Sequence, residues 1–394
     1  MSLNFHYRCI DCGREYQIEP GIMLCPDCEK TRKPDEPLKG VLEVVAEGKA
    51  DGSITGRNTT GSIEDFVFQF LPVEKEYFPS IPVGNTPLWQ PELLRRKTDF
   101  EKLFLKDDTL NPTGSFKDRA SYLVAAFARK HGIGEVTVAS TGNAASSMAG
   151  VGAASGLKVR IFIPATAPKA KMVQALQYGA EVNLVDGSYD IAFDMSIDYT
   201  KKHGGLNRNT AYNPMTIEGK KTVSLELYAQ LGDVPEYMFV PTGDGVILSG
   251  VFKGFKDLLS LGIIDKMPTV YSVQAEGSSA ICRALSTGSF GKPLPSKTIA
   301  DSIAVDVPRG GYYALRSLKE FGGRCITVSD DEILAAQHEL ASNAGLFAEP
   351  ASSAAYAGFL KASRSLPRDS KVVLLITGSG LKDIEAAMKG VKLP

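Results

Sequence analysis

The sequence predicts an α/β protein with two three-layer α/β/α subdomains and a small cysteine-rich ribbon at the N-terminal end. Two observations predict this arrangement: short apolar segments alternate with helical segments of ten or more residues, and the chain has 394 residues. Short strands separated by such helices indicate parallel sheets covered by helices on both faces. A chain of this length is too long for one small core and suggests about two to three structural units.

Two series of strands divide the chain into its subdomains. In the first series we expect helices at 118–130, 143–154, 168–178 and 188–202, and strands at 136–139, 158–163 and 181–185. In the second we expect strands at 237–240, 269–274, 325–328 and 372–376. The sequence therefore predicts a smaller α/β subdomain over 113–225 and a larger one over 39–112 and 226–394. A ligand cleft is expected where the carboxyl ends of the strands meet.

Four of the six cysteines lie within the first thirty residues, in the pattern C-x2-C-x12-C-x2-C. Each C-x2-C pair can place two thiolates on one tetrahedral metal ion, which a segment this small needs because it has almost no core of its own. The spacing favours a zinc ribbon over residues 1–38, with disulfide bonds as the alternative. We expect a closed, structural zinc site formed by Cys9, Cys12, Cys25 and Cys28.

Composition and charge describe an ordinary globular protein. Hydrophobic residues make up 43% of the chain and charged residues 23%, and the formal net charge is −1. The chain therefore has no basic excess that would favour nucleic acid or an anionic membrane as a partner. We find no signal peptide and no apolar run long enough to span a bilayer, so we expect a cytoplasmic protein.

Lys117 is the first catalytic candidate, and it lies in the run N-P-T-G-S-F-K-D-R at 111–119. Pro112 and Gly114 predict a turn before it, and apolar residues recur at helical spacing over 121–129. A lysine near a helix N-terminus is unusual, because the helix dipole disfavours a cation there. One explanation is a solvated surface lysine; the other is an amine committed to a Schiff base with a carbonyl cofactor.

Three further segments follow predicted strands and are rich in hydrogen-bond donors. They are S-T-G-N-A-A-S-S at 140–147, P-T-G-D-G-V-I-L-S-G at 241–250 and T-G-S-G-L-K-D at 377–383. Hydroxyl and backbone N–H groups at a helix N-terminus can hold a carboxylate or a phosphate, although Ser, Thr and Asn are also common helix caps. Neither a Walker pattern nor G-x-G-x-x-G is present, which counts against a nucleotide.

The run around Lys117 and these three segments resemble the motifs of the threonine synthase family, which are fold type II pyridoxal-phosphate enzymes. The resemblance extends from Cys9 to Asp383. It implies that 39–394 form a catalytic region dependent on pyridoxal 5'-phosphate. The implied enzyme is a carbon–oxygen lyase that converts a small phosphorylated amino acid, O-phospho-L-homoserine, and water to L-threonine and phosphate. The resemblance also suggests a homodimer.

The resemblance implies a role for each candidate residue. Lys117 would hold pyridoxal 5'-phosphate as a Schiff base and later carry protons. Asn143 would contact the 3-hydroxyl of the cofactor, and Thr377 would face its pyridine nitrogen. Ser140 and Thr141 would line the site of the substrate carboxylate. The residues expected to bind the cofactor phosphate are Gly243, Asp244, Gly245, Val246 and Ile247.

One position departs from the family pattern. Threonine synthases usually have an arginine that binds the phosphate of the substrate at the position where this chain has Thr216. Charge-assisted hydrogen bonds of that kind are worth about 1.5–3 kcal/mol each, more than a threonine hydroxyl returns. The cations that could compensate are Arg208, Lys220 and Lys221.

Thr216 keeps a second hypothesis open, in which the cofactor is the same and the substrate is another amino acid. Such an enzyme would catalyse a related β- or γ-replacement or an elimination, with a cysteate synthase-like or threonine dehydratase-like activity. A third hypothesis is a non-catalytic zinc-ribbon protein that binds partners through its α/β body. This hypothesis gives no role to Lys117, to the predicted phosphate-binding residues 243–247 or to Thr377.

Overall fold

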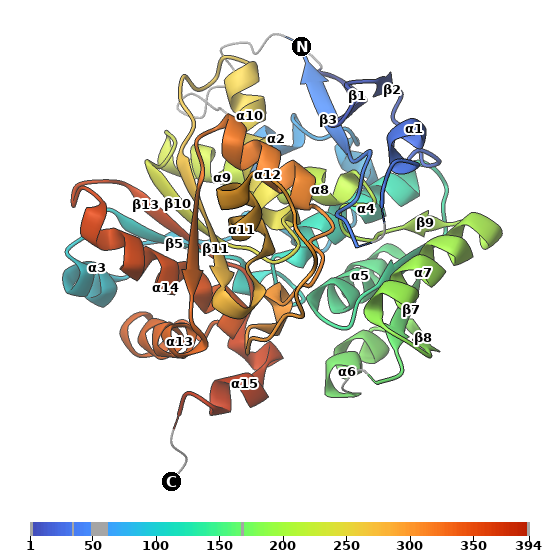
Figure 1. The fold of residues 1–394 in the computed structure, drawn as a ribbon. Coiled ribbons are helices and arrows are strands. Elements are labelled where there is room, and N and C mark those ends of the chain that lie inside the picture. Colours follow the sequence, from blue (N-terminus) through green and yellow to red (C-terminus); the bar gives the residue numbers. More distant parts are fainter. Residues whose placement is uncertain (1–2, 34, 49–61, 167–168, 392–394) are drawn as a thin grey trace.

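The computed structural model describes residues 3–33, 35–48, 62–166 and 169–391. Within these residues the chain forms three β-sheets, and helices cover the two larger sheets (Figure 1). The predicted α/β class, with two sheet-containing subdomains and an N-terminal cysteine-rich unit, is confirmed. No helix in these ranges is both long and apolar enough to cross a membrane.

The larger subdomain contains a six-stranded sheet in the order β12-β11-β10-β13-β5-β4. Its strands are β4 (Leu88–Trp89), β5 (Leu103–Asp107), β10 (Tyr237–Pro241), β11 (Thr269–Ala275), β12 (Arg324–Val328) and β13 (Val372–Ile376). Neighbouring strands are parallel except at the edge, where β4 pairs antiparallel with β5. All five residues of β13 are apolar and buried, as expected for a central strand covered on both faces.

Alternate side chains of β13 enter two different hydrophobic cores. Val373 and Leu375 share a core with residues of α10 (Val246–Ser260). Leu374 and its neighbours on the same face share the other core with α14 (Pro350–Ala362). Because successive residues of a strand point to opposite faces of the sheet, one short strand holds both helices in place.

The remaining helices of the larger subdomain surround this sheet. They are α2 (Ile63–Phe68), α3 (Glu92–Thr98), α9 (Thr222–Leu231), α11 (Ala280–Thr287), α12 (Gly311–Glu320), α13 (Asp330–Ala344) and α15 (Ile384–Met388). Short 3-10 helices lie in the connections: η2 (Lys75–Tyr77), η3 (Asp108–Leu110), η4 (Glu276–Ser278), η5 (Asp301–Ile303), η6 (Ser363–Ser365) and η7 (Gly380–Lys382).

The smaller subdomain contains a parallel four-stranded sheet in the order β8-β7-β6-β9. Its strands are β6 (Glu135–Ala139), β7 (Lys158–Pro164), β8 (Glu181–Val185) and β9 (Leu206–Asn207). The helices of this part are α4 (Lys117–Lys130), α5 (Asn143–Ser155), α6 (Lys169–Gln177), α7 (Tyr189–His203) and α8 (Met215–Lys220). Helices α5 and α7 both pack against β6 and β7, and α4 packs against α5 and α8.

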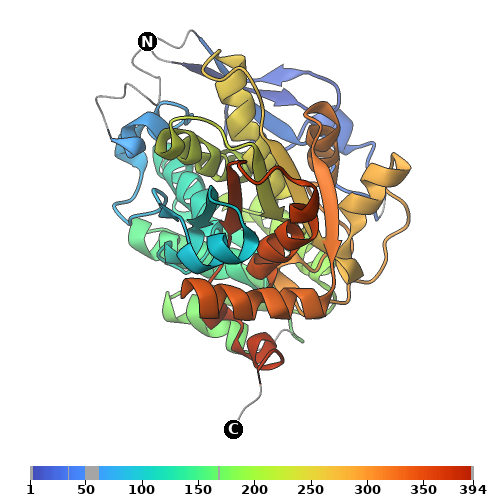
Figure 2. The ribbon, with the colours of Figure 1, turned by 90° about the vertical axis from the view of Figure 1, so that its left-hand side faces the viewer.

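The N-terminal ribbon has a three-stranded sheet and one short helix. Its elements are β1 (Asn4–Cys9), β2 (Glu15–Tyr16), α1 (Pro26–Glu29) and β3 (Leu42–Glu47). Strand β3 pairs with β1 along its whole length, so this sheet extends beyond the predicted ribbon boundary at residue 38. Figures 1 and 2 both show the blue strands of the ribbon at the upper end of the molecule.

Glu43 on β3 joins the ribbon to the larger subdomain. Its carboxylate accepts hydrogen bonds from Lys256 of α10 and from the hydroxyl of Tyr313 of α12, both at 2.9 Å. Arg8 on β1 donates to the other carboxylate oxygen at 2.7 Å. The ribbon is thus held to α10 and α12 by a buried carboxylate.

A buried ion cluster fixes the start of α4. The guanidinium of Arg119 donates to Asp108 at 2.6 Å and to Glu226 at 2.8 Å, and Lys106 donates to Glu226 at 2.6 Å. All four side chains are at most 3% exposed, and removing one partner from such a cluster costs about 3–5 kcal/mol. Because Arg119 follows Lys117 by two residues, the cluster also holds the position of Lys117.

Candidate active site

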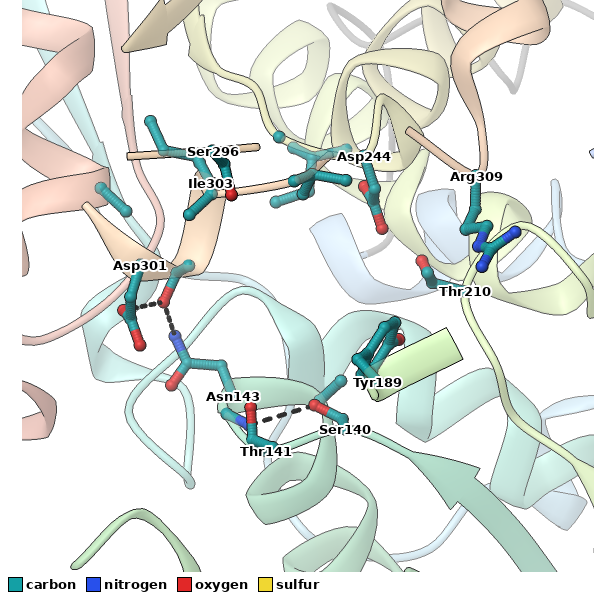
Figure 3. Close-up of a pocket in the computed structure, with 18 of the residues that line it drawn as sticks. Ser140, Thr141, Asn143, Tyr189, Thr210, Asp244, Ser296, Asp301, Ile303 and Arg309 are labelled. Carbon is teal, nitrogen blue, oxygen red and sulfur yellow. Dashed lines mark hydrogen bonds between the residues drawn. The ribbon is translucent and has the colours of Figure 1, made fainter. Parts of the chain in front are cut away.

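A cavity of about 440 Å³ lies at the carboxyl ends of strands from both larger sheets. Lys117, Ser140, Thr141 and Asn143 line it from the smaller subdomain. The larger subdomain contributes five of the predicted residues: Gly243, Asp244, Gly245, Ile247 and Thr377. Figure 3 shows Ser140, Thr141 and Asn143 on one side of the cavity and Asp244 and Ile303 on the other. The tertiary structure therefore brings together segments that are far apart in the sequence.

Lys117 is the first residue of α4, and its side chain reaches the cavity. Burial lowers the pKa of Lys117, and the charge of Arg208 lowers it further. The carboxylates of Asp244 and Glu349 oppose this shift, but the net effect is a lowered pKa. Among the described residues, none accepts a hydrogen bond from the amine of Lys117. An amine with a lowered pKa and no acceptor is available for covalent or proton-transfer chemistry.

The turn before Lys117 is tied to the end of β13. The backbone N–H of Phe116 donates to the carbonyl of Thr377 at 2.8 Å, and the backbone N–H of Thr113 donates to the carboxylate of Asp118 at 2.8 Å. Gly114 has a φ of +80°, which a residue with a side chain rarely adopts. These contacts set Lys117 and Thr377 beside the same cavity.

The segment that begins α5 places polar side chains on the cavity wall. The hydroxyl of Ser140 accepts a hydrogen bond from the backbone N–H of Gly142 at 3.2 Å, which caps the turn before Asn143. The side-chain amide of Asn143 donates to the carboxylate of Glu349 at 3.0 Å and to the hydroxyl of Ser302 at 3.4 Å. Asn143 thus links the two subdomains across the cavity.

Glu349 is a site residue that the sequence analysis did not identify. It precedes α14, lines the cavity and is 4% exposed. Burial raises the pKa of Glu349, while Asn143 and Lys117 oppose the shift. A Cβ at Gly378 would lie 2.5 Å from Oε1 of Glu349, so a side chain at this position would displace the carboxylate. The sequence signal was a Glu-Pro pair at a helix start, where an acidic residue is favourable.

The glycine-rich segment forms a tight cradle at the N-terminus of α10. Gly245 is the residue before the helix, with φ of +87°, and a Cβ there would lie 2.9 Å from that of Ala314. A Cβ on Gly243 would lie 2.8 Å from the Cα of Ile303. Val246 does not line the cavity; its backbone N–H donates to the carboxylate of Asp244 at 3.0 Å. Helix N-termini of this shape bind phosphate groups.

Arg208 adds a buried guanidinium to the cavity wall. It is 0% exposed, and its hydrogen bonds go to the hydroxyl of Ser121 at 3.2 Å and the carbonyl of Lys117 at 3.4 Å. Burial lowers the pKa of Arg208 to about 10, against the opposing charge of Asp244. No described carboxylate is hydrogen-bonded to Arg208, so this cation can accept an anionic partner in the cavity.

The other two candidate cations behave differently from Arg208. Lys221 is ion-paired with Asp257 at 2.7 Å and with Glu218, and it does not line the cavity. Lys220 is 1% exposed, and burial together with the nearby charges of Arg208 and Lys117 lowers its pKa well below the usual value, while Asp244 opposes this shift. Thr216 is also buried away from the cavity, since its hydroxyl donates to the carbonyl of Asn213 at 2.8 Å.

The four ribbon cysteines converge on one point. The Sγ atoms of all four lie within 4.8 Å of one another, a separation that tetrahedral coordination of one ion requires. Each sulfur belongs to a free cysteine. The residues are Cys9, Cys12, Cys25 and Cys28.

The chain is similar to proteins of known function. The profile of a family described as "Pyridoxal-phosphate dependent enzyme" matches residues 80–378. A threonine synthase of Methanosarcina acetivorans is 34% identical over 96% of this chain and 92% of its own length. A threonine synthase of Methanocaldococcus jannaschii is 33% identical over 98% of this chain and 95% of its own length.

Solved structures support the fold. The processed form of threonine deaminase isoform 2 from Solanum lycopersicum superimposes with a TM-score of 0.70 at 22% identity, over 84% of this chain and 90% of that one. Diaminopropionate ammonia lyase from Escherichia coli gives a TM-score of 0.68 at 16% identity, over 88% of this chain and 94% of that one. At such identities the likeness concerns the fold alone.

Proposed function

This chain belongs to the threonine synthase family of pyridoxal-phosphate dependent enzymes, and we propose that it converts O-phospho-L-homoserine and water to L-threonine and phosphate. Identities of 33–34% over nearly the whole chain support this reaction. The structural observation that carries the proposal is the amine of Lys117, which lies in the cavity without a hydrogen-bond acceptor among the described residues.

The cavity residues fit pyridoxal phosphate. The backbone N–H groups of 243–247 and the dipole of α10 would bind its phosphate. The amide of Asn143 would donate to the 3-hydroxyl, and the hydroxyl of Thr377 would meet the ring nitrogen. When bound, the cofactor supplies an electron sink for charge that develops on the substrate. A neutral hydroxyl at the ring nitrogen leaves that nitrogen largely unprotonated, which suits elimination and replacement.

Lys117 would act as the general base and acid. Its lowered pKa favours the neutral amine, which can take a proton from Cα of the substrate and return protons at the neighbouring carbons. Ser140 and Thr141 would hold the substrate carboxylate at the N-terminal end of α5. In the balanced reaction, phosphate leaves from Cγ and water adds its hydroxyl at Cβ.

Arg208 is our candidate for the residue that binds the phosphate of the substrate. It lines the cavity, is fully buried and is hydrogen-bonded to no described carboxylate. The side chain of Thr216 is engaged with a backbone carbonyl, and Lys221 is neutralised by its ion pairs. Arg208 would therefore supply the charge-assisted contact that the substitution at Thr216 removes.

The experiment that tests the proposed function follows phosphate and threonine together. Purified protein loaded with pyridoxal phosphate is given O-phospho-L-homoserine, and both products are measured in the same tube. We expect equal amounts of the two. If protein that carries the cofactor releases neither product, the proposed substrate is wrong.

A second candidate function keeps the cofactor and changes the substrate. The observation that favours it is the position of Thr216, which provides no cation at the place where the family has one. Under this alternative, the loaded protein would eliminate or replace a group on another amino acid, as a threonine dehydratase or a cysteate synthase does. Release of an α-keto acid from threonine or serine would identify the dehydratase-like case.

We also propose that the four ribbon cysteines bind a structural zinc ion. The support is their mutual distance of at most 4.8 Å and their all-sulfur composition, which leaves no open coordination position. A homodimer and a cytoplasmic location stay predictions from the sequence.

A further inference from the structure

A lysine that the proposed function does not use joins the two subdomains. Lys382 is the last residue of η7, in the segment that follows Thr377 of the cavity wall. Its amine donates to the carbonyl of Thr113 at 2.9 Å, to the hydroxyl of Ser146 at 3.2 Å and to the side-chain carbonyl of Gln174 at 2.6 Å. One side chain of the larger subdomain is therefore hydrogen-bonded to three segments of the smaller one: the turn before α4, α5 and α6.

The three acceptors are connected to one another and to the cavity wall. Ser146 lies near the start of α5, and its hydroxyl also donates to the carbonyl of Asn143 at 3.3 Å. The side-chain amide of Gln174 donates to the same carbonyl of Thr113 that Lys382 contacts, at 3.1 Å. The hydrogen bonds of Lys382 thus reach the helix whose N-terminal end is proposed to hold the substrate carboxylate.

Packing as well as hydrogen bonding specifies the position of Lys382. A Cβ at Gly114 would lie 3.5 Å from Cδ of Lys382, so the stem of the lysine lies against the turn before α4. Burial lowers the pKa of Lys382, while the charges of Glu349 and Asp118 oppose this shift. An ammonium group has three N–H donors and a neutral amine has two. Lys382 can therefore join the subdomains in either protonation state.

The start of α4 is fixed independently of Lys382. The buried ion pairs of Arg119 and the hydrogen bond from Phe116 to Thr377 hold it in place. Helix α6, by contrast, packs against α5. Figures 1 and 2 show α6 at the lower end of the molecule, as they do α15, which follows Lys382. Loss of the Lys382 amine should therefore affect α5 and α6 more than the position of Lys117.

We propose that Lys382 is a positioning residue that holds α5 and α6 against the larger subdomain, so that residues 140–143 are in place before the substrate carboxylate arrives. The identity of the substrate in this inference rests on the proposed function. Lys382 does not line the cavity, so it acts through Ser146 and Gln174. Without it, the smaller subdomain adopts the binding arrangement for only a fraction of the time, and the apparent affinity falls by that fraction.

The variant Lys382→Met removes the amine and keeps an unbranched stem. We expect KM for O-phospho-L-homoserine to rise by between about 10-fold and about 100-fold, as for a binding arrangement populated about 1–10% of the time. The value of kcat should change less than about threefold, because bound substrate itself holds α5 in place. The dissociation constant of pyridoxal phosphate should also change less than about threefold, since the proposed phosphate cradle belongs to the larger subdomain.

A matched control breaks the same kind of hydrogen bond within one subdomain. Lys319 of α12 donates to the carbonyl of Gly288 at 3.0 Å, and both residues belong to the larger subdomain. Lys319→Met should leave KM and kcat unchanged. Gln174→Leu removes an acceptor of Lys382 and should raise KM in its own right. In the Lys382→Met background it should add less than about twofold, because residues that act through one contact are not additive.

Hydrogen exchange provides a readout that does not depend on turnover. In the protein freed of cofactor, the backbone amides of α6 should exchange at least about fivefold faster in Lys382→Met than in the unsubstituted protein. The amides of β13 should change little, since that strand is buried in the larger subdomain. Lys319→Met should leave the exchange of α6 unchanged.

Four results would overturn the inference. A fall in kcat without a rise in KM would assign Lys382 to the chemical step, and an equal loss of affinity for pyridoxal phosphate would assign it to the cofactor site. Unchanged exchange of α6 would show that Lys382 does not hold this helix. Effects of Lys382→Met and Gln174→Leu that multiply would show that the two residues act separately. Failure of the proposed substrate is recognised separately, because the unsubstituted protein would then not convert O-phospho-L-homoserine, while the exchange of α6 would still respond to Lys382→Met.

Discussion

The guanidinium of Arg309 is ion-paired with the carboxylate of Asp190, and both residues line the cavity. Asp190 belongs to α7 of the smaller subdomain, whereas Arg309 lies just before α12 of the larger one. The carbonyl of Arg309 also accepts a hydrogen bond from the backbone N–H of Leu38, the last residue of the predicted ribbon, at 3.0 Å. One residue therefore connects the ribbon, the larger subdomain and the smaller subdomain at the edge of the candidate active site.

We expect Asp190→Asn to affect substrate affinity more than stability. The carboxylate of Asp190 is 59% exposed, and a pair of this kind contributes about 0.2–1 kcal/mol. Loss of the contact between the subdomains should raise KM by up to about fivefold with kcat nearly unchanged. Steady-state kinetics measure both constants. A fall in kcat larger than the rise in KM would contradict this view of the pair.

Lys117→Ala should abolish most of the catalysis. A positioned general acid–base group contributes about 10²- to 10⁴-fold, so kcat should fall by at least about 100-fold. The matched control is Lys201→Ala, because Lys201 is exposed on α7 away from the cavity. Phosphate release measures kcat for both variants. Lys117→Ala should also lose the visible absorbance band that sodium borohydride removes from the loaded enzyme.

Arg208→Gln should weaken recognition of the phosphorylated substrate. Loss of a charge-assisted contact worth about 1.5–3 kcal/mol corresponds to a fall in kcat/KM of about 10- to 150-fold. The affinity for pyridoxal phosphate should change little if Arg208 serves the substrate. An equal loss of cofactor affinity and of kcat/KM would assign Arg208 to the cofactor instead.

The stability of the protein should fall in acid partly through Glu43. Burial alone would raise the pKa of Glu43, but Lys256, Lys253 and the hydrogen bond from Arg8 bring it down to about 2. A carboxyl group with a lowered pKa in the folded state contributes stability that is fully present above its unfolded pKa, about 4.5, and is lost as the pH falls toward 2. The contribution is about 3 kcal/mol.

Glu43→Gln should therefore flatten the dependence of the free energy of unfolding on pH between about 5 and 2. Urea denaturation at a series of pH values measures it. An exposed carboxylate, Glu101, offers the comparison variant Glu101→Gln, which should leave the slope nearly unchanged. Equal slopes in the Glu43 variant and the unsubstituted protein would refute the role of Glu43.

Removal of zinc should destabilise the ribbon. Through the hydrogen bond between Leu38 and Arg309, it should also destabilise the edge of the cavity. Metal analysis of the purified protein should find one zinc per chain, and Cys12→Ser should reduce this content. A structural zinc site stabilises a segment that has little core of its own, so the melting temperature should fall by several degrees. A chelator that extracts the metal without any change in melting temperature would count against a structural role.

The sequence predicted three strands of the smaller sheet, four strands of the larger sheet and four helices of the smaller subdomain within a few residues, because these strands are short apolar runs and these helices carry clear periodicity. It also identified Lys117 and the segments after β6, β10 and β13, since side chains that follow parallel strands meet at one edge. It did not predict β4 and β9, two strands of two residues each, or the pairing of β3 with β1. Pairing between distant strands leaves no local pattern in the chain.

What the sequence by itself determined is the set of chemical groups: one lysine at a helix start, a glycine-rich helix N-terminus and four cysteines at metal-binding spacing. Only the tertiary structure decided which cation faces which anion. Lys220 and Lys221 are adjacent in the chain, yet Lys221 is ion-paired with Asp257, whereas Lys220 forms no ion pair with a described residue. The reason is that successive residues on a helix point about 100° apart, so their partners depend on which elements pack against each side.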